Sequence, residues 1–400
     1  MIEPPRMRYC IQCVYPAASA APLAFDDDGL CSGCRVAAEK DHIDWDERLE
    51  ELREIVEQYR VKDRSNYDCI IPVSGGKDSY FQTYMMTEVF KLRPLLVTYH
   101  GNNYLPVGLE NLKNMRETFG VDHIFFTPSV PVLQKMNRLT FRMMGDMNWH
   151  AHCGIYTYPI QIAYKFRVPL IIWGEHGYTD LAGMHSLHDR VEMTARTRLE
   201  HAQRGYDWYD MIEETEGLTE QDLLWAKYPT DEQLAEVGIR GIFIGNYLNW
   251  EPNKQTALMK QWGFKESPEP FERTYRRMSN LDDMHENGAH DYLKYVKFGY
   301  GRASDNASKD IRAGKMTREE GIEMVRQYDH VKPMKDLPRW FEYTGISEEE
   351  FDRIADTFRD PRVWAKNESG EWIKDNIWDF EERRRRERQE QERVAQEIRA

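Results

Sequence analysis

Short apolar runs alternate with longer amphipathic stretches between residues 67 and 252. In the longer stretches, apolar positions recur every three or four residues, which is the spacing of one helix face. Strands that alternate with helices predict an α/β fold, a doubly wound and mainly parallel sheet with helices on both faces. The expected strands are 67–73, 94–99, 123–127, 169–173 and 241–248, and the expected helices are 78–91, 109–120, a stretch after Pro131, and 154–167.

The pattern changes on both sides of this region. Residues 41–60 predict an amphipathic helix, and the chain from about 253 is mostly helical and ends in a charged helix over 381–400. Residues 176–216 are irregular and predict an insertion at the carboxyl end of a strand, where open α/β sheets bind ligands. The expected parts are a ribbon (1–40), a linking helix (41–66), a nucleotide-binding domain (67–252), a helical substrate or partner region (253–330) and a charged helical extension (331–400).

The segment between the first expected strand and the first expected helix is the most informative. Its residues are Ser74, Gly75, Gly76, Lys77, Asp78 and Ser79. Glycines let the backbone approach an anion closely, and the free N–H groups at a helix start bind phosphate. The spacing differs from the Walker A motif. The order Ser-Gly-Gly-x-Asp-Ser resembles the PP-loop of ATP pyrophosphatases of the HUP fold type, which holds the β- and γ-phosphates of ATP. The resemblance implies that Lys77 and Asp78 are catalytic, with Asp78 also a helix cap or a ligand of Mg²⁺.

The PP-loop resemblance gives roles to two further strand ends. The second strand ends in Thr98, Tyr99 and His100, where such enzymes usually hold the adenosine. The fourth strand ends in Gly174 and Glu175, with Asp180 shortly after, where such enzymes bring a glycine near the α-phosphate and acidic residues near Mg²⁺. Glu175 is therefore expected to be a magnesium ligand or a general base. The alternative for Glu175 is a helix cap or a structural ion pair.

Four of the six cysteines form two Cys-x-x-Cys pairs near the N-terminus. They are Cys10, Cys13, Cys31 and Cys34. Pairs at this separation are typical of a zinc ribbon, and four thiolates complete a tetrahedral shell with no open position. The pattern predicts structural Zn²⁺, and the alternatives are a redox role or an iron–sulfur cluster.

The two remaining cysteines have different expected environments. Cys69 lies in the first strand and is predicted to be buried. Cys153 is predicted to lie at a helix start, a position that lowers a thiol pKa, so it is the candidate for reactivity. The alternatives for Cys153 are a packed or pocket-lining role and a second metal site.

Charge and hydropathy exclude some partners. The chain carries 54 basic and 68 acidic side chains, a net charge of −14. Phosphate contacts dominate nucleic-acid affinity, so no nucleic-acid partner is expected. No apolar run approaches the roughly 18 residues of a membrane span, and the first residues lack a signal-peptide pattern. We therefore expect a cytoplasmic protein without a membrane partner.

A block late in the chain, residues 290–303, reads His-Asp-Tyr-Leu-Lys-Tyr-Val-Lys-Phe-Gly-Tyr-Gly-Arg-Ala. Together with the four-cysteine ribbon, the Ser-Gly-Gly-Lys-Asp-Ser loop, the 153–155 helix start and the 172–175 strand end, this block resembles the N-acetyl sugar amidotransferases. The resemblance covers about residues 8–330, including 308–320. Such enzymes make acetamidino sugars for surface polysaccharide or for the nonulosonic acids that decorate flagellin.

The resemblance implies a reaction in two steps. ATP adenylates the acetamido oxygen of an N-acetyl sugar or nonulosonic acid, and ammonia then replaces the resulting O-linked AMP to leave an amidine. Lys294 and Lys297 lie one helical turn apart and would stabilise the transferring phosphate. The alternative is a pair of surface lysines. Residues 176–201 would form the sugar pocket or only a covering loop.

The nitrogen donor is expected to be external. The sequence has no Gly-x-Cys-x-Gly glutaminase elbow, and residue 2 is Ile2 rather than a cysteine nucleophile. Ammonia would therefore be free or would come from a separate glutaminase subunit. Two other functions stay open: a PP-loop tRNA thiolation enzyme, and a non-catalytic nucleotide-binding regulatory protein.

Overall fold

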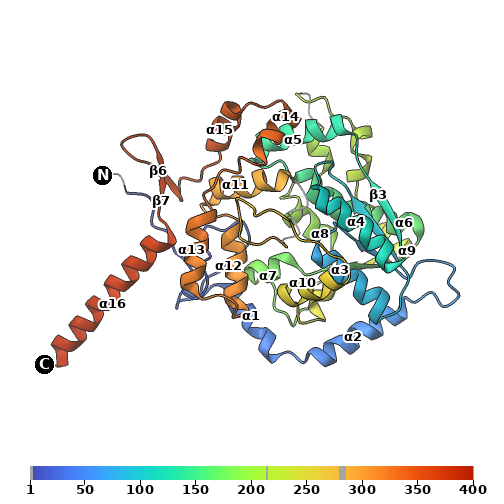
Figure 1. Cartoon of the computed structure of the whole chain (residues 1–400), viewed down its shortest axis with the longest axis horizontal. Helices are drawn as coiled ribbons and strands as arrows, with labels where there is room; N and C mark the ends of the chain where they lie inside the picture. Colours follow the sequence, from blue (N-terminus) through green and yellow to red (C-terminus); the bar gives the residue numbers. More distant parts are fainter. Residues whose placement is uncertain (1–2, 213–214, 279–284, 400) are drawn as a thin grey trace.

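The computed structural model, shown in Figure 1, describes residues 3–212, 215–278 and 285–399. Its centre is a five-stranded parallel sheet with the order β3-β2-β1-β4-β5, which confirms the predicted doubly wound fold. The chain moves from β1 toward one edge and later returns to the other side of β1, so the strand order reverses between β1 and β4. Ligands bind at such a switch point, outside the carboxyl ends of the strands. The strands are β1 Cys69–Pro72, β2 Pro94–Tyr99, β3 Asp122–Phe126, β4 Leu170–Trp173 and β5 Arg240–Phe243.

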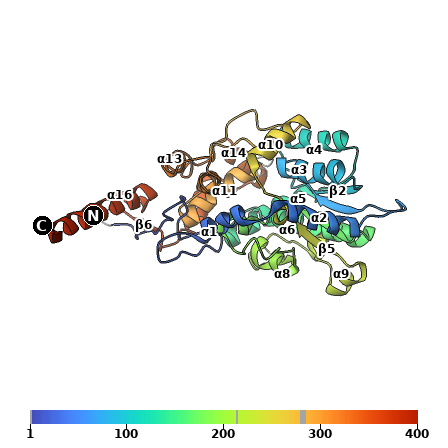
Figure 2. The same ribbon diagram turned by 90° about the horizontal axis from the view of Figure 1, so that it is seen from below.

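Helices cover both faces of the sheet because successive strand residues point to opposite sides. Ile71 and Leu96 pack on one side with residues of α2, α3, α4 and α10, and Ile70 and Leu95 pack on the other with residues of α6. Figure 2 shows α3, α4 and α10 on the same side of the sheet. These helices are α2 Trp45–Gln58, α3 Lys77–Tyr84 with a π-helical continuation Met85–Val89, α4 Pro106–Phe119, α5 Val130–Met144, α6 Trp149–Phe166, α9 Asp231–Val237 and α10 Pro252–Gln261.

The rest of the described chain packs around the carboxyl end of the sheet or extends from it. The N-terminal segment packs against the C-terminal region, with Met7 and Val14 in one cluster with Trp364 and Ile377. The last helix, α16, projects away from the body (Figure 1). These elements are α1 Ser32–Glu39, α7 Gly177–Ala182, α8 Ala195–Thr197, α11 Glu286–Phe298, α12 Arg302–Arg312, α13 Arg318–Tyr328, α14 Leu337–Thr344, α15 Glu348–Asp356, β6 Trp364–Lys366, β7 Trp372–Lys374 and α16 Ile377–Arg399. Within the described residues, no helix is long and apolar enough to cross a membrane.

Two predicted boundaries need correction, and one hairpin was not predicted. The fifth strand ends at Phe243, because Ile244–Asn246 forms a 3₁₀ turn where the sequence predicted strand up to residue 248. Helix α6 begins at Trp149 and not at residue 154. The antiparallel β6–β7 hairpin was not predicted, because strands of three residues are too short to show an alternating pattern.

Candidate active site

The segment 74–79, called the phosphate loop below, has a backbone conformation that its glycines make possible. Gly75 has a φ of +86°, and a Cβ at this position would lie 2.8 Å from the carbonyl oxygen of Gly108. Gly76 is the N-cap of α3, and no side chain caps the first turn of this helix. The first N–H groups of α3 are therefore open to an anion, as the sequence predicted for a phosphate-binding loop.

The side chains of the loop lie beside these N–H groups and line a cavity. The backbone N–H of Ser74 donates to Ser79 Oγ at 2.9 Å, which closes the turn, and Lys77 Nζ lies 2.5 Å from Asp78 Oδ1. Lys77 is only 6% exposed, so its ammonium group is held within the wall of the site. Ser74, Lys77, Asp78 and Ser79 all line a cavity of about 300 Å³ at the switch point of the sheet.

Part of the cavity lining is aromatic. Val97 and Tyr99 of β2, Tyr156 of α6, Trp173 of β4 and the following Gly174 line it. Flat apolar side chains of this kind pack well against a purine ring. Tyr99 and Gly174 therefore lie where the predicted roles, contact with the adenosine and with the α-phosphate, remain possible.

Thr98 and His100 do not line the cavity, although the sequence grouped them with Tyr99. Their neighbours place them on the other face of the strand, as the alternation of side chains requires. Thr98 Oγ1 donates to the carbonyl oxygen of Val73 at 2.7 Å, and the His100 ring lies 4.8 Å from that of Phe125. Burial lowers the pKa of His100 to about 4, so this ring is neutral and packed.

Two charged residues of the lining, Glu175 after β4 and Lys309, form a group with Asp180, which lies behind them. Lys309 of α12 places its Nζ 2.8 Å from Glu175 Oε1 and also pairs with Asp180 of α7. Burial and the neighbouring Asp180 raise the pKa of Glu175, and Lys309 acts against them. Although burial also acts on Asp180, Lys309 holds the pKa of that carboxyl below its usual range. The group contains a carboxylate that can accept a proton and a cation that can meet a phosphate oxygen.

Asp78 and Glu175 are the carboxylates predicted to hold Mg²⁺, and both line the cavity. Mg²⁺ is commonly bound by one or two carboxylates together with substrate phosphates, so this donor set fits when a nucleotide is present. The two carboxylates do not form a cage by themselves. Across the described ranges of the chain, only the four cysteines bring three or more metal-ligand atoms within 4.8 Å of one another.

Lys294 and Lys297 do not act as the expected pair. Lys294 forms an ion pair with Asp305, which lines the cavity, so Lys294 reaches the site only through that carboxylate. Lys297 donates to the carbonyl oxygen of Met144 at 3.2 Å and lies 3.9 Å from Asp146 Oδ2, in a separate buried cluster. With side-chain exposures of 12% and 13%, neither is a surface lysine, so that alternative is wrong.

Helix α12 supplies residues that the sequence did not single out. Asp305, Asn306 and Lys309 all line the cavity from α12, together with Arg302 at its first position. Their separations of three or four residues put them on one helix face. This spacing is the signal that could have identified them.

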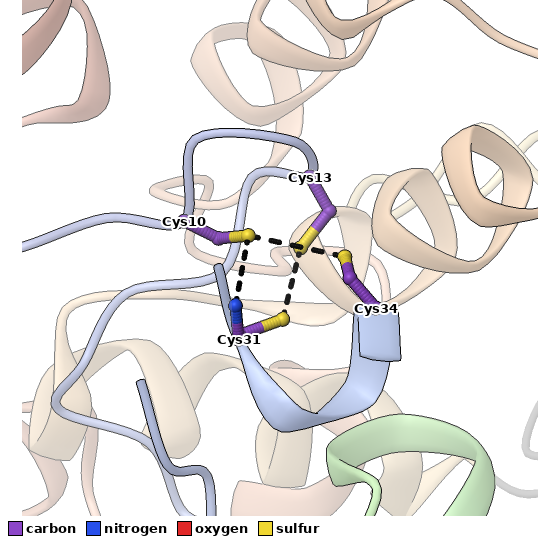
Figure 3. Close-up of side chains that lie close together, drawn as sticks. All are labelled: Cys10, Cys13, Cys31 and Cys34. Carbon is purple, nitrogen blue, oxygen red and sulfur yellow. Dashed lines mark hydrogen bonds between the residues drawn. The ribbon is translucent and has the colours of Figure 1, made fainter. Parts of the chain in front are cut away.

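The four cysteines converge as predicted (Figure 3). Cys10 Sγ lies 3.8 Å from Cys34 Sγ, and Cys13 Sγ lies 3.7 Å from Cys31 Sγ. Four thiolates around Zn²⁺ at about 2.3 Å would have sulfur–sulfur separations of about 3.8 Å, so the cluster fits a tetrahedral zinc site. The backbone N–H of Cys31 also points at Cys10 Sγ, at 3.4 Å.

Arg312 connects this cluster to the cavity. Its guanidinium nitrogens lie 3.5 Å from Cys34 Sγ and from Cys31 Sγ, and one of them donates to the carbonyl oxygen of Asp180 at 2.9 Å. Lys309, one turn earlier on α12, pairs with the carboxylate of the same Asp180. The four-cysteine ribbon and the group of Glu175, Asp180 and Lys309 therefore both contact α12 and α7.

Cys153 has the packed role that the sequence left open, and the structure does not support a reactive thiol there. Because α6 begins at Trp149, Cys153 is inside the helix and not at its N-terminus. The thiol is fully buried, and burial raises its pKa to about 12, so it is a packed residue. Cys69 is buried in β1, as predicted.

The His-rich insertion divides into two parts. Gly177 and Leu181 of α7 line the cavity. The residues that follow cover the ribbon helix and α2: Ser186 donates to Glu39, and Arg48 of α2 donates to the carbonyl oxygen of Leu187. The insertion therefore contributes a short wall to the site, and part of it covers other elements.

Among the comparisons with known proteins, the family match covers the C-terminal part of the chain. Residues 272–382 match the family described as "LPS biosynthesis protein WbpG-like, C-terminal domain". This segment includes α11 and α12, and so Asp305 and Lys309. A curated relative, "Uncharacterized protein MJ1599" from Methanocaldococcus jannaschii, is 27% identical over 113 residues, which are 28% of this chain. The chain covers 40% of the length of that relative.

Solved structures give looser matches. The NH3-dependent NAD synthetase from Campylobacter jejuni matches with 11% identity and a TM-score of 0.28, over 57% of this chain and 98% of that one. The U34-tRNA thiolase NcsA from Methanococcus maripaludis matches with 14% identity and a TM-score of 0.27, over 79% and 88%. Overlaps with such low scores carry no argument about function. The α/β assignment follows from the strand order itself.

Proposed function

We propose that this protein is an ATP-dependent amidotransferase that converts the acetamido group of an N-acetyl sugar into an acetamidino group. The observation that carries the proposal is the cavity at the switch point. The phosphate loop forms one of its walls, and α12 from the WbpG-like segment forms another. One site thus joins ATP-binding geometry to a domain similar to those of lipopolysaccharide biosynthesis proteins.

The loop explains the first step. The N–H groups at the start of α3, with Lys77, hold the β- and γ-phosphates of ATP, and the adenine lies toward Tyr99 and Trp173. The acetamido oxygen attacks the α-phosphorus, a P–O bond to pyrophosphate breaks, and an O-linked AMP imidate forms. Mg²⁺, held by Asp78 together with the phosphates, would neutralise charge on the transferring group. Of its two expected roles, Glu175 then takes that of the base. Arg302 and Lys309 provide further positive charge nearby.

The second step needs a proton acceptor. Ammonia attacks the imidate carbon, the C–O bond breaks, and AMP leaves with the oxygen. Glu175 takes the proton that the attacking nitrogen loses, since its raised pKa makes it a better base than an exposed carboxylate. Ammonia is free or comes from a separate glutaminase subunit. We further propose that the four cysteines hold a structural Zn²⁺ that orders the N-terminal segment.

The position of the cysteines disfavours the rival reading as a tRNA thiolation enzyme. Sulfur transfer usually needs a catalytic cysteine pair or a cluster, yet the two cysteines outside the ribbon, Cys69 and Cys153, are both fully buried and line no wall of the cavity. The net charge of −14 is also unfavourable for a tRNA substrate.

The reaction can be tested directly. The protein is incubated with ATP, Mg²⁺, ammonium and a panel of N-acetyl sugars, and AMP, pyrophosphate and product mass are measured. We expect AMP release that depends on the sugar, and a product lighter than the acetamide by the difference between O and NH. The matched control is the same sugar without its acetyl group. No sugar-dependent AMP with any member of the panel would refute the proposal.

A further inference from the structure

Tyr99 lines the nucleotide cavity, and helix α6 fixes where its ring lies. A Cβ on Gly154 of α6 would lie only 2.3 Å from the Tyr99 ring, so the ring occupies the space that this glycine leaves free. The phenol oxygen of Tyr99 lies 3.2 Å from Nδ1 of His150. His150 comes four residues before Gly154 and therefore lies on the same face of α6. One helix face thus contacts both the ring and the hydroxyl of Tyr99.

His150 is in turn held by an acidic residue of the C-terminal segment. Its Nε2 lies 3.1 Å from Glu286 Oε2, and the two side chains are 0% and 1% exposed. Glu286 is the first residue of α11 and belongs to the segment 272–382 that matches the WbpG-like domain. Its other carboxylate oxygen accepts from Asn103 Nδ2 at 2.5 Å. The hydrogen bonds therefore lead from the cavity wall at Tyr99 into the C-terminal segment.

The directions of these hydrogen bonds follow from Tyr99. Burial raises the pKa of its phenol well above the usual range, so the phenol keeps its proton and donates to His150 Nδ1. The ring N–H of His150 is then on Nε2 and donates to Glu286. If the Tyr99 hydroxyl turned away, a buried acceptor on His150 would lose its donor, which is costly.

A wall that only had to be aromatic would not need these groups. Phenylalanine offers a similar ring to a purine, and burying an imidazole and a carboxylate costs free energy that apolar side chains of the same size avoid. A buried polar network has a different benefit, since it favours the one orientation in which its members are satisfied. In this network, the group that is held in one orientation is a ring of the cavity wall.

We propose that His150 and Glu286 are positioning residues that fix the Tyr99 ring for the adenosine end of ATP. The inference rests on the proposed function, from which it takes the nucleotide and its orientation. Neither His150 nor Glu286 lines the cavity, so both act through Tyr99. The C-terminal segment then contributes to the nucleotide site in two ways, directly through α12 and indirectly through Glu286.

Two ligands that share their phosphates test this on the intact protein without turnover. ATP would contact both the phosphate loop and the Tyr99 ring, whereas inorganic tripolyphosphate offers phosphates to the loop alone. Calorimetry with Mg²⁺ and without sugar gives the affinity for each. His150→Leu should weaken ATP binding about tenfold and leave the affinity for tripolyphosphate within about twofold. Equal weakening of both ligands, or of neither, would show a merely structural role and overturn the proposal.

The Tyr99 hydroxyl allows a second test of the same path. Tyr99→Phe keeps the ring and removes the hydroxyl, so it should also weaken ATP binding selectively. In that background His150→Leu should have little further effect on ATP affinity, because the contact through which His150 acts is already absent. Fully additive effects of the two substitutions would contradict the path through the hydroxyl.

Glu286→Gln keeps the size of the side chain and tests the far end of the path if His150→Leu does not fold. We expect a selective loss of ATP affinity of about threefold, because the amide is a weaker acceptor for His150 than the carboxylate. Thermal unfolding checks that the variant is folded. An unchanged ratio of ATP to tripolyphosphate affinity would exclude Glu286 as a positioning residue.

His123→Leu is the matched control. His123 Nε2 lies 2.8 Å from Oγ1 of Thr98, the residue before Tyr99, on the face of β2 that does not line the cavity. Its removal should leave the ratio of the two affinities unchanged. A loss like that of His150→Leu would mean that any disturbance of β2 is sufficient, and would refute a specific role of His150.

The two proposals fail in different ways. Selective loss of ATP affinity in these variants, without AMP release from any sugar, would refute the amidotransferase and leave the positioning role intact. Sugar-dependent AMP release together with unchanged affinity ratios in the variants would do the reverse.

Discussion

The phosphate loop and the Glu175–Lys309 pair, which Asp180 supports, line one cavity, yet the chain builds them differently. The loop consists of six consecutive residues between β1 and α3, and its shape follows from local conformation, as at Gly75 with its φ of +86°. The charged group joins residues separated by 134 positions, Glu175 and Lys309, across elements that must first pack together.

This difference has consequences for how each part responds to change. The conformation of the loop is set by its own residues, so substitutions within it should act directly on the proposed binding of phosphate. The charged group depends on where α12 and α7 lie, and Arg312 ties both of these helices to the ribbon. Disturbing the ribbon should therefore reach the charged group while leaving the loop in place.

Substitution in the loop should have the largest effect. Lys77→Met should reduce AMP release by about 10²- to 10³-fold, because the transferring phosphates lose a cationic hydrogen-bond donor. Such a donor contributes more at a buried position than in water. Thermal unfolding and zinc content should stay unchanged. Kinetics of AMP release check the prediction, with Lys113→Met as the matched control. Near-normal turnover would show that the loop does not hold ATP.

Substitution in the charged group should have a smaller effect with a distinctive pH dependence. Lys309→Met should reduce AMP release by about 10- to 10²-fold. Lys309 lowers the pKa of Glu175 against burial, so its removal should raise that pKa further. If Glu175 acts as a carboxylate, the acidic limb of the kcat/KM profile should move to higher pH. An unshifted limb would exclude Glu175 as the titrating base.

The link between the ribbon and the charged group can be tested at Arg312. Arg312→Gln removes a cation next to the thiolates, so zinc affinity should fall about tenfold, measured by competition with a chelator. The pH profile should shift in the same direction as in Lys309→Met, while ATP affinity should be nearly unchanged. Weaker ATP binding together with an unshifted profile would contradict the division between loop and charged group.

The same division explains what the sequence could predict. The loop and the cysteine pairs follow from adjacent residues, and the alternation of strands and helices follows from simple periodicity. The role of Lys309 does not, because Lys309 acquires its partners only when α12 packs beside α7. At Cys153 the predicted helix start was five residues late, so the thiol was considered at a helix start that would lower its pKa, whereas it is buried inside α6 with a raised pKa. Likewise, a shared helix face linked Lys294 and Lys297, but tertiary packing directs them to different carboxylates.

Lys297 should give the smallest effect and the sharpest contrast with Lys309. Its ammonium group lies in a separate cluster with Asp146, and burial lowers its pKa to about 8. The unfolded chain therefore binds more protons than the folded chain above about pH 8. The free energy of unfolding should then rise with pH in the wild type relative to Lys297→Met, by about 1 kcal/mol between about pH 8 and pH 9. Denaturant unfolding at the two pH values measures this difference.

Because Lys297 does not line the nucleotide cavity, AMP release by Lys297→Met should stay within about threefold of the wild type. A large loss of activity with an intact fold would mean that the catalytic site extends beyond the cavity to this cluster.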